Sequence, residues 1–150
     1  MTTNPVLVSQ AAQKPEYAHH IKEAVQYAKT HFHNFANAHK DIGQPSETLV
    51  NFESLSEADK KNFILMVYEK LGVSFGIEIL KIIPGWVSTQ LDPRMAYDRE
   101  GMLLSARRMA KLYEQAGCSR ERFMIKVPST WEGIQAAKEY EMYLSFLLNL

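Results

Sequence analysis

The most constraining feature of the sequence is an apolar run that contains one lysine and leads directly into a helix start. Residues 123–127 follow a charged segment and precede Pro-Ser-Thr, which is typical of a strand buried on both faces of a parallel sheet. Strand alternation places Phe123, Ile125 and Val127 on one face, and Met124 and Lys126 on the other. We therefore expect the Lys126 side chain to point away from the apolar face of this strand.

The residues after this strand predict a helix. Ser129 and Glu132 have the S-x-x-E spacing of a capping box, in which each side chain satisfies a free backbone N–H. Lys126 would then lie at a β-to-α corner, where α/β proteins place their chemistry. An amine held away from water has a lowered pKa and can act as a nucleophile, forming a Schiff base with a carbonyl. The alternative is a structural lysine that extends to solvent or pairs with a carboxylate.

Composition narrows the functional classes. A chain of 150 residues is about one domain, and 17 basic residues balance 17 acidic ones, so we expect no overall basic field for nucleic acid or an anionic membrane. The single cysteine, Cys118, cannot form an internal disulfide, which favours a reducing, cytoplasmic location. We expect no secretory signal, because residues 1–5 have neither a basic region nor a long apolar region. We expect no membrane span, because the apolar residues 76–87 are interrupted by charges and by Pro84-Gly85.

The first third of the chain predicts one helix and one long loop. Residues 6–8 are apolar and are interpreted as the end of a strand. Apolar residues at helical spacing predict a helix over residues 15–32 that starts at Pro15. Residues 33–55 have no period and predict a long surface loop. The five histidines fall on expected exposed positions, and His31-x-His33 has no acid or cysteine at ligand spacing, so no metal site is expected.

The remaining residues alternate between helices and strands. Ser56 predicts the start of a long helix that ends before Pro84-Gly85 and that bends or splits at its internal glycines. Residues 86–91 predict a strand whose polar face carries Gln90. Asp98 and Gly117 predict the two ends of the next helix. This βα alternation calls for a parallel sheet with right-handed crossovers, although so few strands do not close a barrel.

Five segments of the chain, in this order, resemble the transaldolases. They are residues 2–5 (TTNP), 78–85 (EILKIIPG), 87–94 (VSTQLDPR), 106–117 (ARRMAKLYEQAG) and 125–136 (IKVPSTWEGIQA). The resemblance implies that residues 1–150 form one partial domain, an incomplete (β/α)₈ TIM-type barrel of roughly strands 2 to 4 with their helices. Residues 33–55 would be a loop insertion and residues 143–150 a divergent apolar tail.

The resemblance also implies a function in the pentose phosphate pathway. Transaldolases transfer a dihydroxyacetone unit from a ketose phosphate, sedoheptulose 7-phosphate or fructose 6-phosphate, to an aldose phosphate. Carried over by position, Lys126 would be the Schiff-base nucleophile, and Asn4, Thr3 and Ser129 would contact the sugar phosphate. No metal or organic cofactor is expected, because the protonated imine serves as the electron sink.

Because the chain departs from the family pattern at several positions, the resemblance does not decide whether the chain is catalytically active. The glutamate that handles protons in the family is Gln90 here, and an amide cannot exchange protons at neutral pH. Losing one acid or base typically costs about 10²- to 10⁴-fold in rate. The family's first-strand aspartate and its phosphate-binding arginine have no counterpart in the chain. The sequence therefore also fits an inactive truncated paralogue that pairs with a full-length barrel or with itself, or a chain without a stable fold.

Overall fold

The core of the structure is a small parallel sheet. The computed structural model describes residues 2–3, 5–35 and 49–148. Its strands β1 (Thr2–Thr3), β2 (Val87–Gln90) and β3 (Phe123–Lys126) lie side by side in chain order, and both pairings are parallel. The predicted α/β class with a parallel sheet is confirmed, and the arrangement is compatible with part of a barrel.

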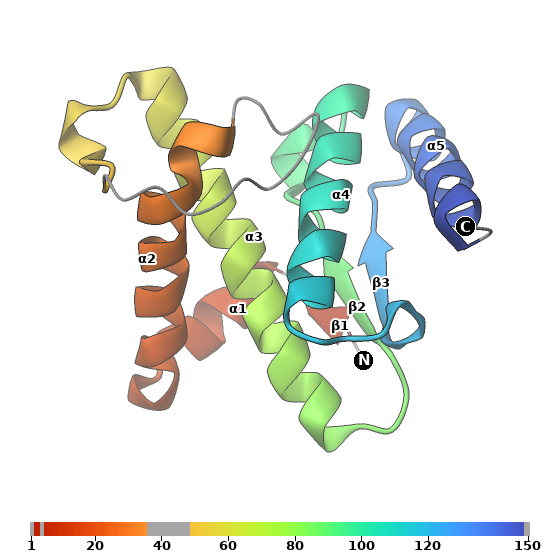
Figure 1. The fold of residues 1–150 in the computed structure, drawn as a ribbon, viewed down its shortest axis with the longest axis horizontal. Coiled ribbons are helices and arrows are strands. Elements are labelled where there is room, and N and C mark those ends of the chain that lie inside the picture. Colours follow the sequence, from red (N-terminus) through yellow and green to blue (C-terminus); the bar gives the residue numbers. More distant parts are fainter. Residues whose placement is uncertain (1, 4, 36–48, 149–150) are drawn as a thin grey trace.

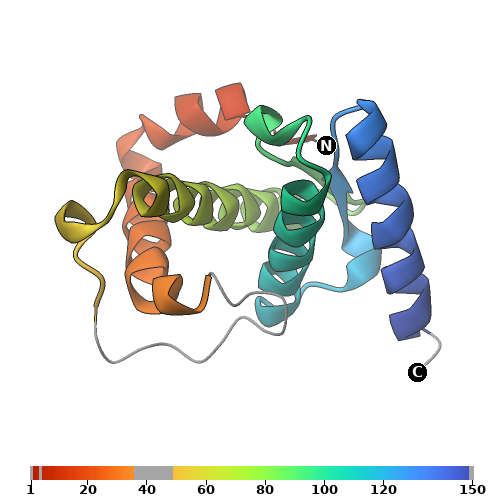
Figure 2. The same ribbon diagram turned by 90° about the horizontal axis from the view of Figure 1, so that it is seen from above.

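Helices cover one face of this sheet (Figure 1). The described helices are α1 (Pro5–Ala12), α2 (Ala18–Phe35), α3 (Glu57–Ile82), α4 (Arg99–Gln115) and α5 (Trp131–Leu148). Helix α3 packs on β1 and β2, and α4 packs on β3 between α3 and α5. Helix α2 packs on α3, and Figure 2 shows it outside the layer that covers the sheet.

The N-terminal third differs from the sequence prediction. Residues 6–8, expected to end a strand, lie in α1, and Pro5 occupies its first position, where a missing N–H costs nothing. Helix α2 continues to Phe35, so the predicted loop begins later than residue 33. Residues 36–48 of that loop lie outside the described residues. Its end is anchored where the Val50 N–H donates to the Lys29 carbonyl at 3.0 Å.

Helix α3 is continuous over 26 residues, so it does not split at Gly72 or Gly76. Ser56 caps its start, as predicted, by accepting a hydrogen bond from the Asp59 N–H at 3.2 Å. Gly76 instead has a packing role. A Cβ atom there would lie 1.8 Å from the Tyr113 hydroxyl oxygen, so glycine lets this side chain pass close to α3.

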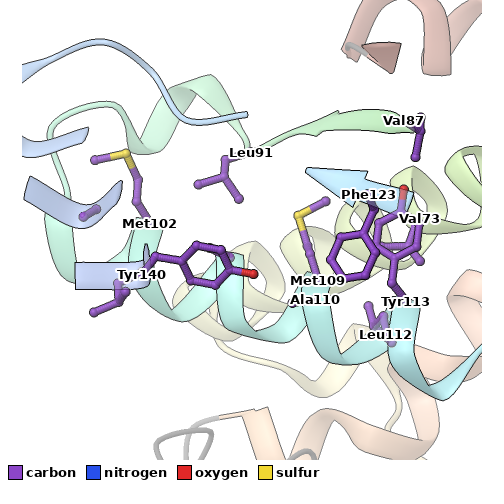
Figure 3. Close-up of a cluster of buried hydrophobic side chains, with 13 residues drawn as sticks. Val73, Val87, Leu91, Met102, Met109, Ala110, Leu112, Tyr113, Phe123 and Tyr140 are labelled. Atoms are coloured by element: carbon purple, nitrogen blue, oxygen red, sulfur yellow. The ribbon is translucent and has the colours of Figure 1, made fainter. Parts of the chain in front are cut away.

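The hydrophobic core lies between the sheet and α4 (Figure 3). Tyr113 stacks on Phe123 with ring centroids 4.4 Å apart, and its hydroxyl is 2.5 Å from Oγ1 of Thr89. Burial raises the pKa of Tyr113 to about 12, although the hydrogen bond to Thr89 opposes this. These contacts join α4 to both β2 and β3.

Both predicted ends of α4 are confirmed. Asp98 caps the start by accepting from the Gly101 N–H at 2.9 Å. At the other end Gly117 has φ of 76°, and the Cys118 N–H donates to the Tyr113 carbonyl at 3.0 Å. This is the pattern of a Schellman C-cap, which favours glycine at the left-handed position.

A buried ionic cluster that the sequence analysis did not predict joins α3 to α4. Glu69 accepts from Arg108 Nε at 2.8 Å, from Arg108 Nη2 at 2.6 Å and from the Ser105 hydroxyl at 2.5 Å. Glu69 is 1% exposed. A buried carboxylate needs such partners because its hydration is lost.

His20 is also buried, contrary to the expectation that all the histidines are exposed. Its Nε2 lies 3.8 Å from Glu78, and its Nδ1 lies 4.0 Å from Glu23. Burial lowers the pKa of His20, and His19 and Lys81 act in the same direction, while the two carboxylates oppose the shift. The surroundings of this ring in α2 and α3 therefore favour its neutral form.

Candidate functional site

Polar side chains gather on the sheet face opposite the helices. Along β2, Val87 and Thr89 are buried, whereas Ser88 and Gln90 are only half-buried. Gln90 is in register with Lys126 of β3, and neighbouring strands lie about 4.8 Å apart. The structure therefore places Gln90 and Lys126 side by side at the carboxyl ends of their strands.

The expected shielding of Lys126 from water is wrong for the described chain. Its side chain is exposed, because β3 is the last strand of the sheet and no described element covers this face. Its backbone is nevertheless fixed, since the Leu91 N–H donates to the Lys126 carbonyl at 3.0 Å. Among the described residues no carboxylate pairs with the amine either, so the alternative of a structural ion pair gains no support.

The two other predicted contacts that the structure describes lie apart from each other. Thr3 is 4% exposed and is in register with Thr89, which faces the helices through its contact with Tyr113. Thr3 thus lies on the face opposite Lys126, which does not favour a substrate contact. Ser129 is exposed in the bend between β3 and α5. Asn4 lies outside the described residues.

The cap of α5 is Thr130, one residue later than predicted. Its Oγ1 accepts from the Gly133 N–H at 3.1 Å, so the expected capping box of Ser129 and Glu132 is wrong. A Cβ atom at Gly133 would lie 1.9 Å from the Pro128 carbonyl oxygen, so the chain can turn this tightly only with glycine there.

Thr130 also joins two corners of the sheet. Its hydroxyl donates to the Ala96 carbonyl, in the segment that follows β2. The corner that carries Lys126 is thereby tied to the corner that follows Gln90. The sequence analysis missed this role, although the paired hydroxyls of Ser129-Thr130 offered two candidate caps instead of one.

The carboxyl end of β2 is held by a second set of contacts. The Tyr68 hydroxyl of α3 donates to the Gln90 carbonyl at 3.2 Å, and burial raises the pKa of Tyr68 to about 12, with Asp92 adding to the shift. Asp92 accepts from Arg94 Nε at 3.0 Å. Burial alone would raise the pKa of Asp92, but the hydrogen bonds from Arg94 outweigh it and lower the pKa. Asp92 is therefore ionised at neutral pH, and its carboxylate is paired with Arg94.

The arrangement defines the chemistry open to this face. An amine can add to a carbonyl carbon, while the Gln90 amide can orient a ligand hydroxyl or a water but cannot exchange protons.

Across residues 2–3, 5–35 and 49–148, no group of three His, Cys, Asp or Glu side chains could hold a metal ion. The described helices include none with the length and apolar character needed to cross a membrane.

A parallel sheet with a lysine beside a β-to-α corner is typical of the α/β proteins that place their sites at the carboxyl ends of strands. The family model described as Transaldolase/Fructose-6-phosphate aldolase matches residues 1–143. The chain therefore belongs to this family.

Curated relatives agree with the family match. A transaldolase of Shewanella woodyi is 40% identical over 140 residues, which cover 93% of this chain and 36% of the relative. A transaldolase of Rattus norvegicus is 44% identical over 140 residues, covering 93% of this chain and 34% of the relative. One of Bos taurus is 40% identical over 149 residues, covering 99% and 37%. The chain thus spans about a third of the length of the curated relatives it matches.

Proposed function

We propose that this chain carries the lysine-bearing part of a transaldolase site. The observation that carries the proposal is the place of Lys126, at the carboxyl end of β3 and within the segment matched by the family. We also propose that β1, β2 and β3 correspond to strands 2 to 4 of a (β/α)₈ barrel. Support comes from their parallel order in the sheet, with helices on one face and polar side chains on the other.

The proposed reaction transfers a dihydroxyacetone unit. The Lys126 amine adds to the ketone carbon of fructose 6-phosphate or sedoheptulose 7-phosphate, and water leaves to give a protonated imine. The imine accepts the electron pair of the bond between C3 and C4 as that bond breaks. The C4 hydroxyl gives its proton to a base, the shorter aldose phosphate departs as an aldehyde, and a three-carbon enamine stays on Lys126. The remaining three-carbon unit then bonds to the carbonyl of an acceptor aldose phosphate, and hydrolysis frees the lysine.

The neighbours of Lys126 have narrower roles in this proposal. Gln90 orients a water or a substrate hydroxyl, while a proton-exchanging group must come from elsewhere. Ser129, exposed in the bend that follows β3, is proposed to contact the sugar phosphate, and Asn4 remains a proposed contact on the basis of the sequence. Thr3 is given no such role because of its placement under the helices.

Borohydride trapping tests the proposal. The folded chain is incubated with fructose 6-phosphate and sodium borohydride, and the labelled residue is located by peptide mass spectrometry. We expect a reduced adduct on Lys126, of the whole ketose or of its three-carbon unit, that is absent from Lys126→Arg. The matched control is Lys138→Arg, which changes another exposed lysine on α5 and should leave the adduct intact. Absence of the adduct from the folded wild-type chain would contradict the proposal.

A second candidate is a catalytically inactive family member that serves as a binding or assembly partner. Two observations favour it. Gln90 stands where the family motif has a carboxylate, and Lys126 is exposed on a strand whose outer side has no partner among the described residues. A folded chain that forms no adduct but associates with another polypeptide would support this role. A folded chain that neither forms the adduct nor associates would exclude both candidates.

A further inference from the structure

Where β2 ends, the strand on each side of it leads into a proline. On the β3 side, the Leu91 N–H donates to the Lys126 carbonyl at 3.0 Å. The N–H and C=O groups of one strand residue point to the same side, so the Leu91 carbonyl also turns to β3. In a parallel ladder such a carbonyl accepts from the N–H one residue beyond its register partner, which here is residue 128. That residue is Pro128, which has no N–H.

The Gln90 carbonyl turns the other way, toward β1, because backbone direction alternates along a strand. Thr3 of β1 is the register partner of Thr89. The donor that a continued ladder would offer the Gln90 carbonyl is therefore residue 5. That residue is Pro5, the first residue of α1, and it also has no N–H. A side chain or a water is left to supply the donor for this carbonyl.

The hydroxyl of Tyr68 supplies this donor from α3, which packs on β1 and β2 (Figure 1). It lies 3.2 Å from the Gln90 carbonyl oxygen. Burial raises the pKa of Tyr68 to about 12, with the charge of Asp92 adding to the shift, so the hydroxyl keeps its proton at neutral pH. Asp92 itself accepts from the Arg94 N–H at 2.9 Å and from Arg94 Nε at 3.0 Å. The Tyr68 hydroxyl is thus available to the carbonyl.

We propose that Tyr68 is a positioning residue of the Lys126 site. Its hydroxyl replaces the donor that β1 lacks, so the end of β2 is held by two bonds, from Tyr68 to the Gln90 carbonyl and from the Leu91 N–H to the Lys126 carbonyl. Together these bonds keep the Gln90 side chain beside Lys126. Tyr68 belongs to the helix layer, whereas the Gln90 and Lys126 side chains lie on the opposite face of the sheet, so Tyr68 acts through Gln90. The inference rests on the proposed function, in which Gln90 orients a water or a substrate hydroxyl.

Removing the hydroxyl should slow the reaction of Lys126 with a ketose. A misplacement of about 1 Å can lower the rate at an active site by about 10²-fold, and here one of the two bonds remains. Tyr68→Phe keeps the ring and should lower the rate of borohydride-trapped adduct formation with fructose 6-phosphate by about tenfold, with the fold checked by circular dichroism. The matched control is Tyr27→Phe, which removes another half-buried hydroxyl, from α2, and should leave the rate unchanged.

A double-mutant cycle separates positioning from general stabilisation. Gln90→Ala removes the side chain but keeps the backbone carbonyl that Tyr68 contacts. If Tyr68 acts by positioning the Gln90 side chain, Tyr68→Phe should change the trapping rate by less than about twofold in the Gln90→Ala chain. An equal loss of rate in both backgrounds, or no loss in either, would overturn the inference.

Hydrogen exchange measures the position of β2 without the reaction. In the isotopically labelled chain, the Leu91 amide should exchange at least about tenfold faster in Tyr68→Phe than in the wild type. The Ala106 amide, in the middle of α4, reports larger openings and should change less. An unchanged Leu91 amide, or an equal change at both amides, would contradict the role of Tyr68. If the wild-type chain forms no adduct, the proposed function fails, and the Leu91 exchange still decides whether Tyr68 holds the end of β2.

Discussion

Replacing Gly76 with alanine tests how α3 is fitted to the core. The new methyl group would lie 1.8 Å from Oη and 2.8 Å from Cζ of Tyr113, so the ring must move. Movement breaks the 2.5 Å hydrogen bond to Thr89 and disturbs the stacking on Phe123. Gly72→Ala is the matched control, because its methyl group would lie 3.5 Å from Cγ2 of Thr89, an ordinary contact distance.

The expected magnitude follows from three opposing effects. Alanine favours a helix interior by about 0.8–1 kcal/mol over glycine. Forcing an extra methyl group into a packed core costs about 1–3 kcal/mol, and leaving a buried hydroxyl unpaired costs about 1–3 kcal/mol. Gly76→Ala should therefore lower the free energy of unfolding by about 1–5 kcal/mol. Gly72→Ala should be neutral or stabilising by up to about 1 kcal/mol.

Urea unfolding followed by far-ultraviolet circular dichroism measures both changes. The same pair of substitutions in a Tyr113→Phe background completes the test, because that background lacks the hydroxyl that meets the methyl group. The loss caused by Gly76→Ala should shrink there by at least about 1 kcal/mol. Equal stability of the Gly72→Ala and Gly76→Ala proteins would refute the proposed fit.

Three further predictions concern the buried groups and the α5 cap. Arg108→Met leaves Glu69 buried without its cation and should cost about 3–5 kcal/mol in urea unfolding; a loss below about 1 kcal/mol would show that the pair is not buried in solution. Since the folded state lowers the pKa of His20 below its ordinary value near 6.5, its neutral form contributes stability above that pH. This contribution is lost as the pH falls through the folded value. His20→Gln should flatten the fall of the thermal midpoint between about pH 7 and pH 5, and an unchanged slope would argue against this origin. Thr130→Val should cost about 1 kcal/mol of unfolding free energy through the lost cap, whereas Ser129→Ala should change it by less than about 0.5 kcal/mol; the reverse order would restore Ser129 as the cap.

Features set by neighbouring residues were predictable from the sequence. The caps at Ser56 and Asp98 and the left-handed Gly117 depend on a few consecutive residues. The local sequence pattern is therefore sufficient to predict each of them. The two longer strands follow from short apolar or alternating runs, and the parallel sheet follows from their alternation with helices. The register of Gln90 with Lys126 then follows from the shared carboxyl ends of parallel strands.

Features set by distant residues were not predictable in this way. The choice of Thr130 over Ser129 depends on the close approach of Gly133 to the Pro128 carbonyl and on the distant Ala96. An apolar run of three residues is too short to distinguish a strand from a helix, although Pro5 was a signal for the helix that α1 forms.

Burial of charged groups depends on neighbours that are far away in the chain. Glu69 falls within the apolar spacing of α3, which was a signal for a buried partner, but the identity of Arg108 is a tertiary matter. His20 is buried by α3, and the exposure of Lys126 depends on what lies beyond β3. None of these can be read from local periodicity.

The most direct test of the central claim is the mass of the peptide that contains Lys126 after reduction of the folded chain with borohydride in the presence of fructose 6-phosphate. The account predicts the addition of the reduced ketose or of its three-carbon unit on this peptide and none on the peptide that contains Lys138. An unmodified Lys126 peptide from folded protein, or equal labelling of both lysines, would contradict it.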